Sequence, residues 1–76
     1  MKFKAALFYD GKIAFYSIYC LQSNFYKAKL DEYSGSATPP TLVELIKQPA
    51  GWRSDCAEPD LVQELGAAID QRTASN

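Results

Sequence analysis

The sequence contains no histidine, the side chain that proteins use most often as a general base and as a metal ligand. Only two cysteines are present, and they lie too far apart to form the clustered ligands of a zinc site. The four glycines are isolated from one another, which excludes a glycine-rich phosphate-binding loop. These absences predict a protein without a metal site and without a cofactor.

A long apolar run and an excess of one charge are also missing. No apolar stretch reaches the roughly 18 residues that a membrane-spanning helix needs, so we expect no membrane partner. Eight basic residues against nine acidic residues give a net charge of −1, which provides no overall attraction to nucleic acid.

Paired carboxylates are the remaining means of acid–base catalysis, and the sequence contains two acidic clusters. We interpret Asp31-Glu32 as the solvated end of a strand. Asp55, Glu58 and Asp60 come just before or within the start of an expected helix, where negative charge is favourable. The sequence therefore predicts no catalytic residue and no small-molecule substrate, and we do not expect an enzyme.

The remaining composition is that of an ordinary folded domain. Of the 76 residues, 47% are hydrophobic, which at this length predicts one domain, 1–72, followed by a frayed tail, 73–76. The apolar segment 5–9 ends at Asp10-Gly11, too early for the hydrophobic core of a signal peptide. We expect a cytoplasmic protein.

The two cysteines, Cys20 and Cys56, agree with that location, because small secreted domains usually carry more. We interpret both as small buried hydrophobic side chains. A Cys20–Cys56 disulfide is the alternative, and a reactive thiol is the least favoured interpretation because no histidine is present to activate it.

The first third of the chain predicts a β-hairpin. Residues 2–9 and 12–21 are rich in aromatic and aliphatic side chains, and they flank Asp10-Gly11. This dipeptide favours the type I′ turn, whose two central residues both need positive φ. The two-residue turn sets the register, so that Leu7 opposes Ala14 and Phe8 opposes Ile13.

A third strand is expected from Phe25 to Tyr33, after a turn at residues 22–24. A three-residue loop, with Asn24 in a left-handed conformation, pairs Cys20 with Tyr26 and keeps the lysines of this strand away from the apolar face. One face then gathers ten residues. They are Phe3, Ala5, Leu7, Ala14, Tyr16, Ile18, Cys20, Tyr26, Ala28 and Leu30.

The segment 41–47 lies between Pro40 and Pro49 and is short, which favours a fourth strand. A helix that covers the second face of the sheet is the alternative. Trp52 to Ser54 is a candidate for a brief fifth strand, and Trp52 is expected at one end of the core.

The C-terminal segment predicts a helix from Pro59 to about Gln71, since its apolar residues follow helical spacing. They are Leu61, Val62, Leu65, Ala68 and Ile69. Gly66 is unfavourable inside a helix and indicates a close approach to the sheet or to Trp52.

Together these elements predict an α+β fold. It consists of a small antiparallel sheet, a three-strand meander plus a short fourth strand, with one C-terminal amphipathic helix packed on one face.

The other face of this sheet is the candidate binding surface. It gathers Lys2, Lys4, Phe8, Ile13, Phe15, Ser17, Tyr19, Leu21, Phe25, Lys27, Lys29 and Asp31. A bare apolar patch on a small protein usually marks an interface. We expect a non-catalytic protein-interaction module that forms a homodimer, or binds another protein, through Phe8, Ile13, Phe15, Tyr19 and Leu21.

Single-stranded nucleic acid is the alternative partner. Aromatic side chains beside lysines can stack on bases and neutralise phosphates, and the lysines concerned are Lys2, Lys4, Lys27 and Lys29. The low isoelectric point of about 5.2 counts against this hypothesis.

Overall fold

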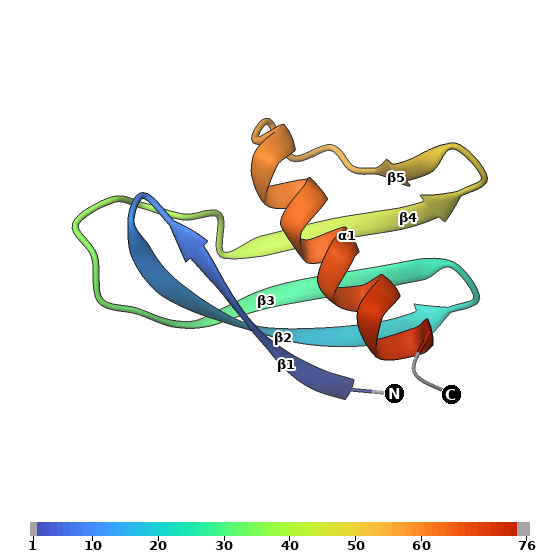
Figure 1. Ribbon diagram of the computed structural model, residues 1–76, viewed down its shortest axis with the longest axis horizontal. Helices are drawn as coiled ribbons and strands as arrows, with labels where there is room; N and C mark the ends of the chain where they lie inside the picture. Colours follow the sequence, from blue (N-terminus) through green and yellow to red (C-terminus); the bar gives the residue numbers. More distant parts are fainter. Residues whose placement is uncertain (1, 75–76) are drawn as a thin grey trace.

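A computed structural model describes residues 2–74 as one antiparallel sheet and one helix (Figure 1). The elements are β1 (Lys2–Tyr9), β2 (Lys12–Gln22), β3 (Phe25–Tyr33), β4 (Leu42–Gln48), β5 (Gly51–Arg53) and α1 (Pro59–Ala74). The strands follow one another in the order β1-β2-β3-β4-β5, and each pairs antiparallel with the next. The predicted α+β fold is confirmed.

The hairpin of β1 and β2 forms as the sequence predicts. Asp10 and Gly11 have φ angles of 50° and 79°, the positive values that a type I′ turn requires. Leu7 pairs with Ala14, and Phe8 pairs with Ile13. The turn therefore sets which side chains of the first two strands share a face.

The pairing of β2 with β3 has the predicted register, but the connection between the two strands differs from the prediction. Cys20 pairs with Tyr26 as expected, yet Gln22 also pairs with Phe25. The connection is thus a two-residue turn with Asn24 at a φ of 67°, and the register shift between Cys20 and Gln22 takes up the extra residue. A second shift lies between Phe15 and Tyr16. The prediction of a three-residue loop was wrong, because a two-residue turn combined with a bulge leaves the same β3 side chains on each face of the sheet.

Residues 42–48 form the fourth strand, so the alternative helix over the second face is wrong. Backbone hydrogen bonds support both ends of the β3–β4 pair. The amide of Leu30 donates to the carbonyl of Thr41 at 2.9 Å, and the amide of Lys47 donates to the carbonyl of Asn24 at 2.7 Å. The brief fifth strand is also present, as β5.

Helix α1 begins at Pro59 as predicted and continues to Ala74, beyond the expected end at Gln71. The Thr73 hydroxyl donates to the carbonyl of Ile69 at 2.9 Å, so this helix enters the segment expected to be a frayed tail. Residues 75–76 of that tail lie outside the described residues.

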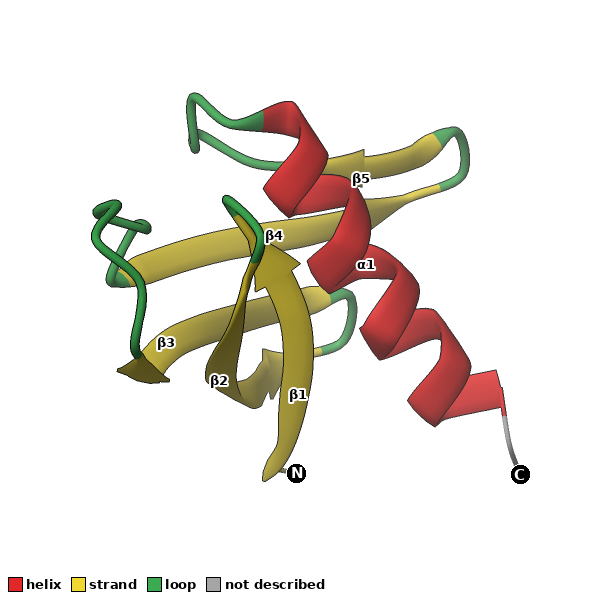
Figure 2. Cartoon of the chain, turned by 60° about the vertical axis from the view of Figure 1, so that its left-hand side comes forward, coloured by secondary structure: helices red, strands yellow, loops and turns green. Residues whose placement is uncertain are grey.

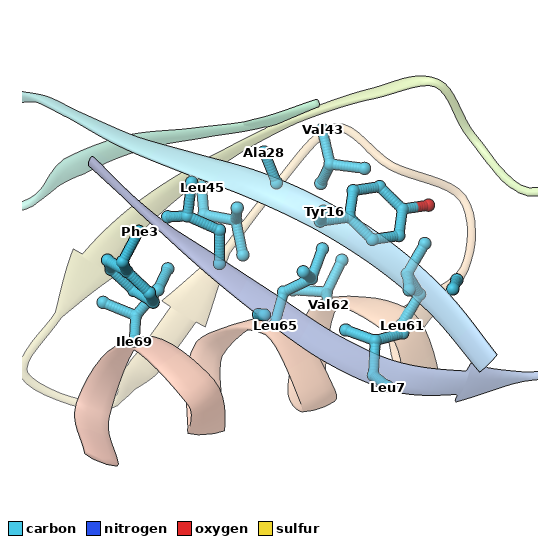
Figure 3. Packing of buried hydrophobic residues seen from close by; sticks show 13 residues of the cluster. Phe3, Leu7, Tyr16, Ala28, Val43, Leu45, Leu61, Val62, Leu65 and Ile69 are labelled. Carbon is cyan, nitrogen blue, oxygen red and sulfur yellow. The ribbon is translucent and has the colours of Figure 1, made fainter. Parts of the chain in front are cut away.

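The core lies between α1 and the sheet face that it covers (Figure 3). It contains Phe3, Ala5, Leu7, Ala14, Tyr16, Ile18, Ala28, Val43, Leu45, Leu61, Val62, Leu65 and Ile69. The Tyr16 side chain is fully buried, and its hydroxyl donates to the carbonyl of Pro40 at 2.7 Å. Burial raises the pKa of Tyr16 to about 12. The remaining three residues predicted on this face, Cys20, Tyr26 and Leu30, are half-buried at its margin.

Trp52 lies beside α1 at one end of the core, as expected. Its indole N–H donates to Asp70 at 3.1 Å, and its ring makes an edge contact with Tyr26 at 5.5 Å between centroids. Lys47 lies over the ring at 5.0 Å and also pairs with Asp70 at 2.7 Å. A Cβ atom on Gly66 would overlap Cδ1 of this ring, so the helical glycine provides the predicted close approach.

Both cysteines are free, which contradicts the alternative of a Cys20–Cys56 disulfide, and both are half-buried and not fully buried as the sequence predicted. Cys56 packs against the core, whereas the Cys20 thiol lies 3.3 Å from the carbonyl oxygen of Gln22. Within residues 2–74, no helix combines the length and the apolar character needed to cross a lipid bilayer.

Leu65→Ala tests the core. Leu65 is fully buried, and we expect the free energy of unfolding to fall by about 2–5 kcal/mol, as for other buried leucine truncations. Urea denaturation followed by Trp52 fluorescence measures this change. Gln63→Ala, at an exposed position of the same helix, is the control and should change stability by less than about 0.5 kcal/mol. An unchanged urea midpoint for Leu65→Ala would contradict the packing.

Gly66→Ala tests the contact with Trp52. Helix propensity alone would stabilise this variant by about 1 kcal/mol. We expect it instead to destabilise the protein by about 1–3 kcal/mol, since the new methyl group overpacks against the indole ring. In a Trp52→Leu background the sign should reverse. Denaturation of the four proteins of this cycle measures the effect, and a stabilised Gly66→Ala single variant would disprove the close contact.

Candidate functional site

The sheet face opposite α1 is the candidate site. Strand alternation and the register place on it the predicted surface residues of β1, β2 and β3. Leu42, Glu44 and Ile46 of β4 extend it, because they pair with Lys29, Lys27 and Phe25. Figure 1 shows the single helix on the other side of the sheet, so within residues 2–74 no helix covers this open face.

One apolar group lies on the open face next to the Asp10-Gly11 turn. We call it the hairpin cluster, and it consists of Phe8, Ile13 and Phe15. Phe8 and Ile13 are cross-strand partners and are 65% and 46% exposed. Phe15 follows on the same face of β2 and is half-buried.

A second apolar group lies on the open face at the opposite end of the strands. We call it the loop-end cluster, and it consists of Leu21, Phe25 and Ile46. Leu21 and Ile46 are 48% and 44% exposed, and Phe25 is half-buried. Phe25 and Ile46 are direct partners across β3 and β4, and Leu21 stands in the register shift of β2, next to Gln22, the partner of Phe25.

A charged band crosses the sheet between the two clusters. It comprises Lys2, Lys4, Ser17, Lys27, Lys29, Asp31 and Glu44. The hydroxyl of Ser17, which is only 4% exposed, donates to the carboxylate of Asp31. Asp31 also lies 3.6 Å from the Lys4 ammonium group. The predicted interface is therefore divided, because Phe8, Ile13 and Phe15 lie on one side of these groups and Leu21 lies on the other.

Tyr19 belongs to neither apolar cluster. The Lys2 ammonium group lies over its ring, 5.4 Å from the centroid, and the ring is half-buried. Lys27, the partner of Tyr19 on β3, lies 4.0 Å from the carboxylate of Glu44. The Tyr19 ring is thus part of the charged band.

The same contacts bear on the four lysines of the nucleic-acid hypothesis. All four lie on the open face, but Lys4 and Lys27 face carboxylates, and Lys2 lies over Tyr19. A lysine that already faces a carboxylate adds less attraction for phosphate. The structure brings no observation that favours this hypothesis over protein binding, and it stays a prediction.

A groove that the sequence did not predict lies between β1 and α1. Three adjoining hollows follow β1 from Phe3 to Asp10 and share residues of α1 as their second wall. Small side chains leave this space open, namely Ala6 on the strand and Ala67 and Ala68 on the helix. The alanines were visible in the sequence, but their facing depends on how α1 crosses β1.

The acidic clusters noted in the sequence do not assemble a metal site. Among residues 2–74, no group of three or more histidine, cysteine, aspartate or glutamate side chains is arranged to hold a metal ion. Asp31 accepts the hydrogen bond from Ser17 in the charged band, and Glu58 accepts a hydrogen bond from the Tyr9 hydroxyl at 2.7 Å.

The hydrogen bond from Ser17 is the main cause of a lowered pKa at Asp31, and the Lys4 charge adds to it. A lowered carboxyl pKa stabilises the folded state above about pH 4, and this stabilisation is lost as pH falls through the lowered value. Ser17→Ala should therefore raise the pKa of Asp31 towards its ordinary value and weaken the acid dependence of stability.

A pH titration of the Asp31 side chain by NMR measures this change. Ser36→Ala, which removes a hydroxyl from an exposed loop, is the matched control and should leave the pKa of Asp31 unchanged. An unaltered titration in Ser17→Ala would show that the hydrogen bond does not hold the charged band together.

Comparison of the chain with models of protein families, with curated proteins and with solved structures found no match.

Proposed function

We propose that this protein is a non-catalytic interaction module that forms a homodimer through the hairpin cluster of its open face. The observation that carries the proposal is the exposure of Phe8 and Ile13 side by side, next to Phe15, on a face that no helix of the described residues covers. Aromatic and aliphatic side chains that are grouped and exposed in this way are typical of an interface.

The energetics favour burial of this cluster. Each large apolar side chain gains about 1.5–3 kcal/mol when it is fully buried, and a second copy supplies the same three residues. Association costs several kcal/mol, so the cluster is the centre of the interface, and contacts around it add the remainder.

The excess of lysines in the charged band favours contact between the two copies at the hairpin end of the open face. It contains Lys2, Lys4, Lys27 and Lys29 against two acids, Asp31 and Glu44. Full face-to-face stacking would place this lysine excess against its own copy, which is unfavourable. An interface centred on the hairpin cluster avoids this repulsion, places Glu32, the cross-strand partner of Phe15, at its edge, and leaves Tyr19 and Leu21 outside its centre.

We also propose that the homodimer acts in the cytoplasm. The support is that both cysteines are free, since stable disulfides belong mainly to oxidising compartments.

Ile13→Glu tests the dimer, with Ile46→Glu as a matched control. Both positions carry isoleucine on the open face at 46% and 44% exposure, but Ile13 lies in the hairpin cluster and Ile46 in the loop-end cluster. We expect Ile13→Glu to be a folded monomer, because a carboxylate would be buried without a partner in the interface. Ile46→Glu should retain the mass of the wild type.

Light scattering at several concentrations gives the molar mass, and circular dichroism checks that each variant keeps its helix. A wild type that stays monomeric at high concentration would remove the homodimer. A dimer that is lost in Ile46→Glu but kept in Ile13→Glu would move the interface to the other end of the sheet.

A further inference from the structure

Within residues 2–74, the outer edge of β1 has no strand partner. β1 pairs only with β2 and stands at the end of the strand order. In the tight turn the carbonyl of Tyr9 accepts from the amide of Lys12, and hydrogen-bonded pairs then alternate along the hairpin. The amides and carbonyls of Lys4, Ala6 and Phe8 consequently point away from β2.

The opposite edge of the sheet is formed by a very short strand, whereas β1 is long. β5 has only three residues, and just beyond it the Ser54 hydroxyl donates to the carbonyl of Glu44 on β4. β1 has eight residues, with neither proline nor a register shift in its pairing. Proteins usually shorten, bend or cover an edge strand because its free backbone groups attract another strand.

The free edge of β1 forms one wall of the groove, and α1 forms the other. Figure 2 shows α1 beside β1 and inclined to it. The lining residues of β1 are consecutive and so belong to both faces of the strand, and Ala67, Ala68 and Gln71 of α1 lie opposite. A single extended chain suits a space bounded by a strand edge and a helix. A second copy suits it less, because its own β1 carries an α1 on the same side.

Charge differs between the two ends of the groove. The hollow beside Tyr9 is lined by four carboxylates, those of Asp10, Glu58, Asp60 and Glu64. The hollow beside Phe3 is lined by Lys4 and Arg72. A chain antiparallel to β1 begins beside the acidic hollow and ends beside the basic hollow. Basic residues at its N-terminal end and an acidic residue at its C-terminal end would match these charges.

We propose that the groove binds an extended peptide as a sixth strand, antiparallel to β1, with basic residues at the peptide's N-terminal end. The free amides and carbonyls of Lys4, Ala6 and Phe8 bond to its backbone, and the carboxylates near Tyr9 bind its basic side chains. This peptide site goes beyond the homodimer and does not depend on it, because Ile13 lies on β2 and outside the groove.

The probe is the peptide Lys-Arg-Thr-Val-Thr-Val-Ser-Glu, titrated into the full chain and followed by calorimetry. The control is the peptide of reversed sequence, which has the same composition. We expect the first peptide to bind about tenfold more tightly, because the reversed peptide places its charges wrongly in antiparallel pairing. Equal affinity of the two peptides, or no binding by the first, would overturn the proposal.

Hydrogen exchange provides a readout that charge attraction alone would not give. Peptide binding should slow exchange of the Lys4, Ala6 and Phe8 amides. The Phe3, Ala5 and Leu7 amides, which already bond to β2, should change little. Equal slowing of both sets, or of neither, would contradict strand addition.

Two variants test the protein side. Glu64→Gln should weaken binding by about fivefold, whereas Glu44→Gln, on the open face of β4, should not change it. Ala6→Pro removes an outward amide without removing a bond to β2, so circular dichroism should be retained and binding lost. The Ile13→Glu variant should bind the peptide as the wild type does.

Mass measurements separate the peptide from a second copy as the occupant of the groove. If Ala6→Pro abolished a wild-type dimer and left peptide affinity unchanged, the edge would pair copies of the chain, and the peptide proposal would be wrong.

Discussion

A single helix has to shield a sheet of five strands, and this constraint shapes the molecule. α1 packs on β1, β4 and β5, the two ends of the sheet, while β2 and β3 form its middle. The sheet has to curl so that Tyr16, Ile18 and Ala28 of the middle strands are also buried beneath the helix. Because the only described helix is used on this side, the open face is left with exposed apolar side chains. Because a helix packs beside β1 in place of a further strand, the outer edge of β1 has no strand partner within residues 2–74.

Hydrogen bonds, as well as the burial of apolar side chains, hold the helix in its position on the sheet. Asp70 accepts hydrogen bonds from Lys47 and Trp52, and so joins α1 to β4 and β5. The bond from Lys47 is the main cause of a lowered pKa at Asp70, which keeps this carboxylate charged and paired over the ordinary pH range. Gly66 lets the indole ring lie directly against the helix backbone. At the other end of the helix the Tyr9 hydroxyl binds Glu58, so both ends of α1 are tied to the sheet.

The sequence was most informative where local chemistry decides the structure. Asp10-Gly11 predicted the position and type of the turn. Because successive side chains of a strand alternate between the two faces of the sheet, that turn also predicted which side chains of β1 and β2 share a face. Gly66 was informative for a similar reason, because a glycine in a helix needs an explanation. The bulge after Cys20 could not be predicted, since a loop and a bulge give the same facing of side chains. The charged band depends on pairing among three strands, and the groove depends on the angle at which α1 crosses β1. Neither the charged band nor the groove can be predicted from the spacing of residues along one segment.

The open face and the groove meet at one residue. Phe8 directs its side chain into the hairpin cluster, while its backbone amide and carbonyl lie on the free edge of β1. A peptide bonded to that backbone would fix the conformation of the strand beneath the dimer interface. Any change that peptide binding makes in the strength of dimerisation must be matched by an equal change that dimerisation makes in peptide binding. The proposed dimer and the proposed peptide site therefore share Phe8, whose side chain belongs to one and whose backbone belongs to the other, while Ile13 and Glu64 each belong to one site only.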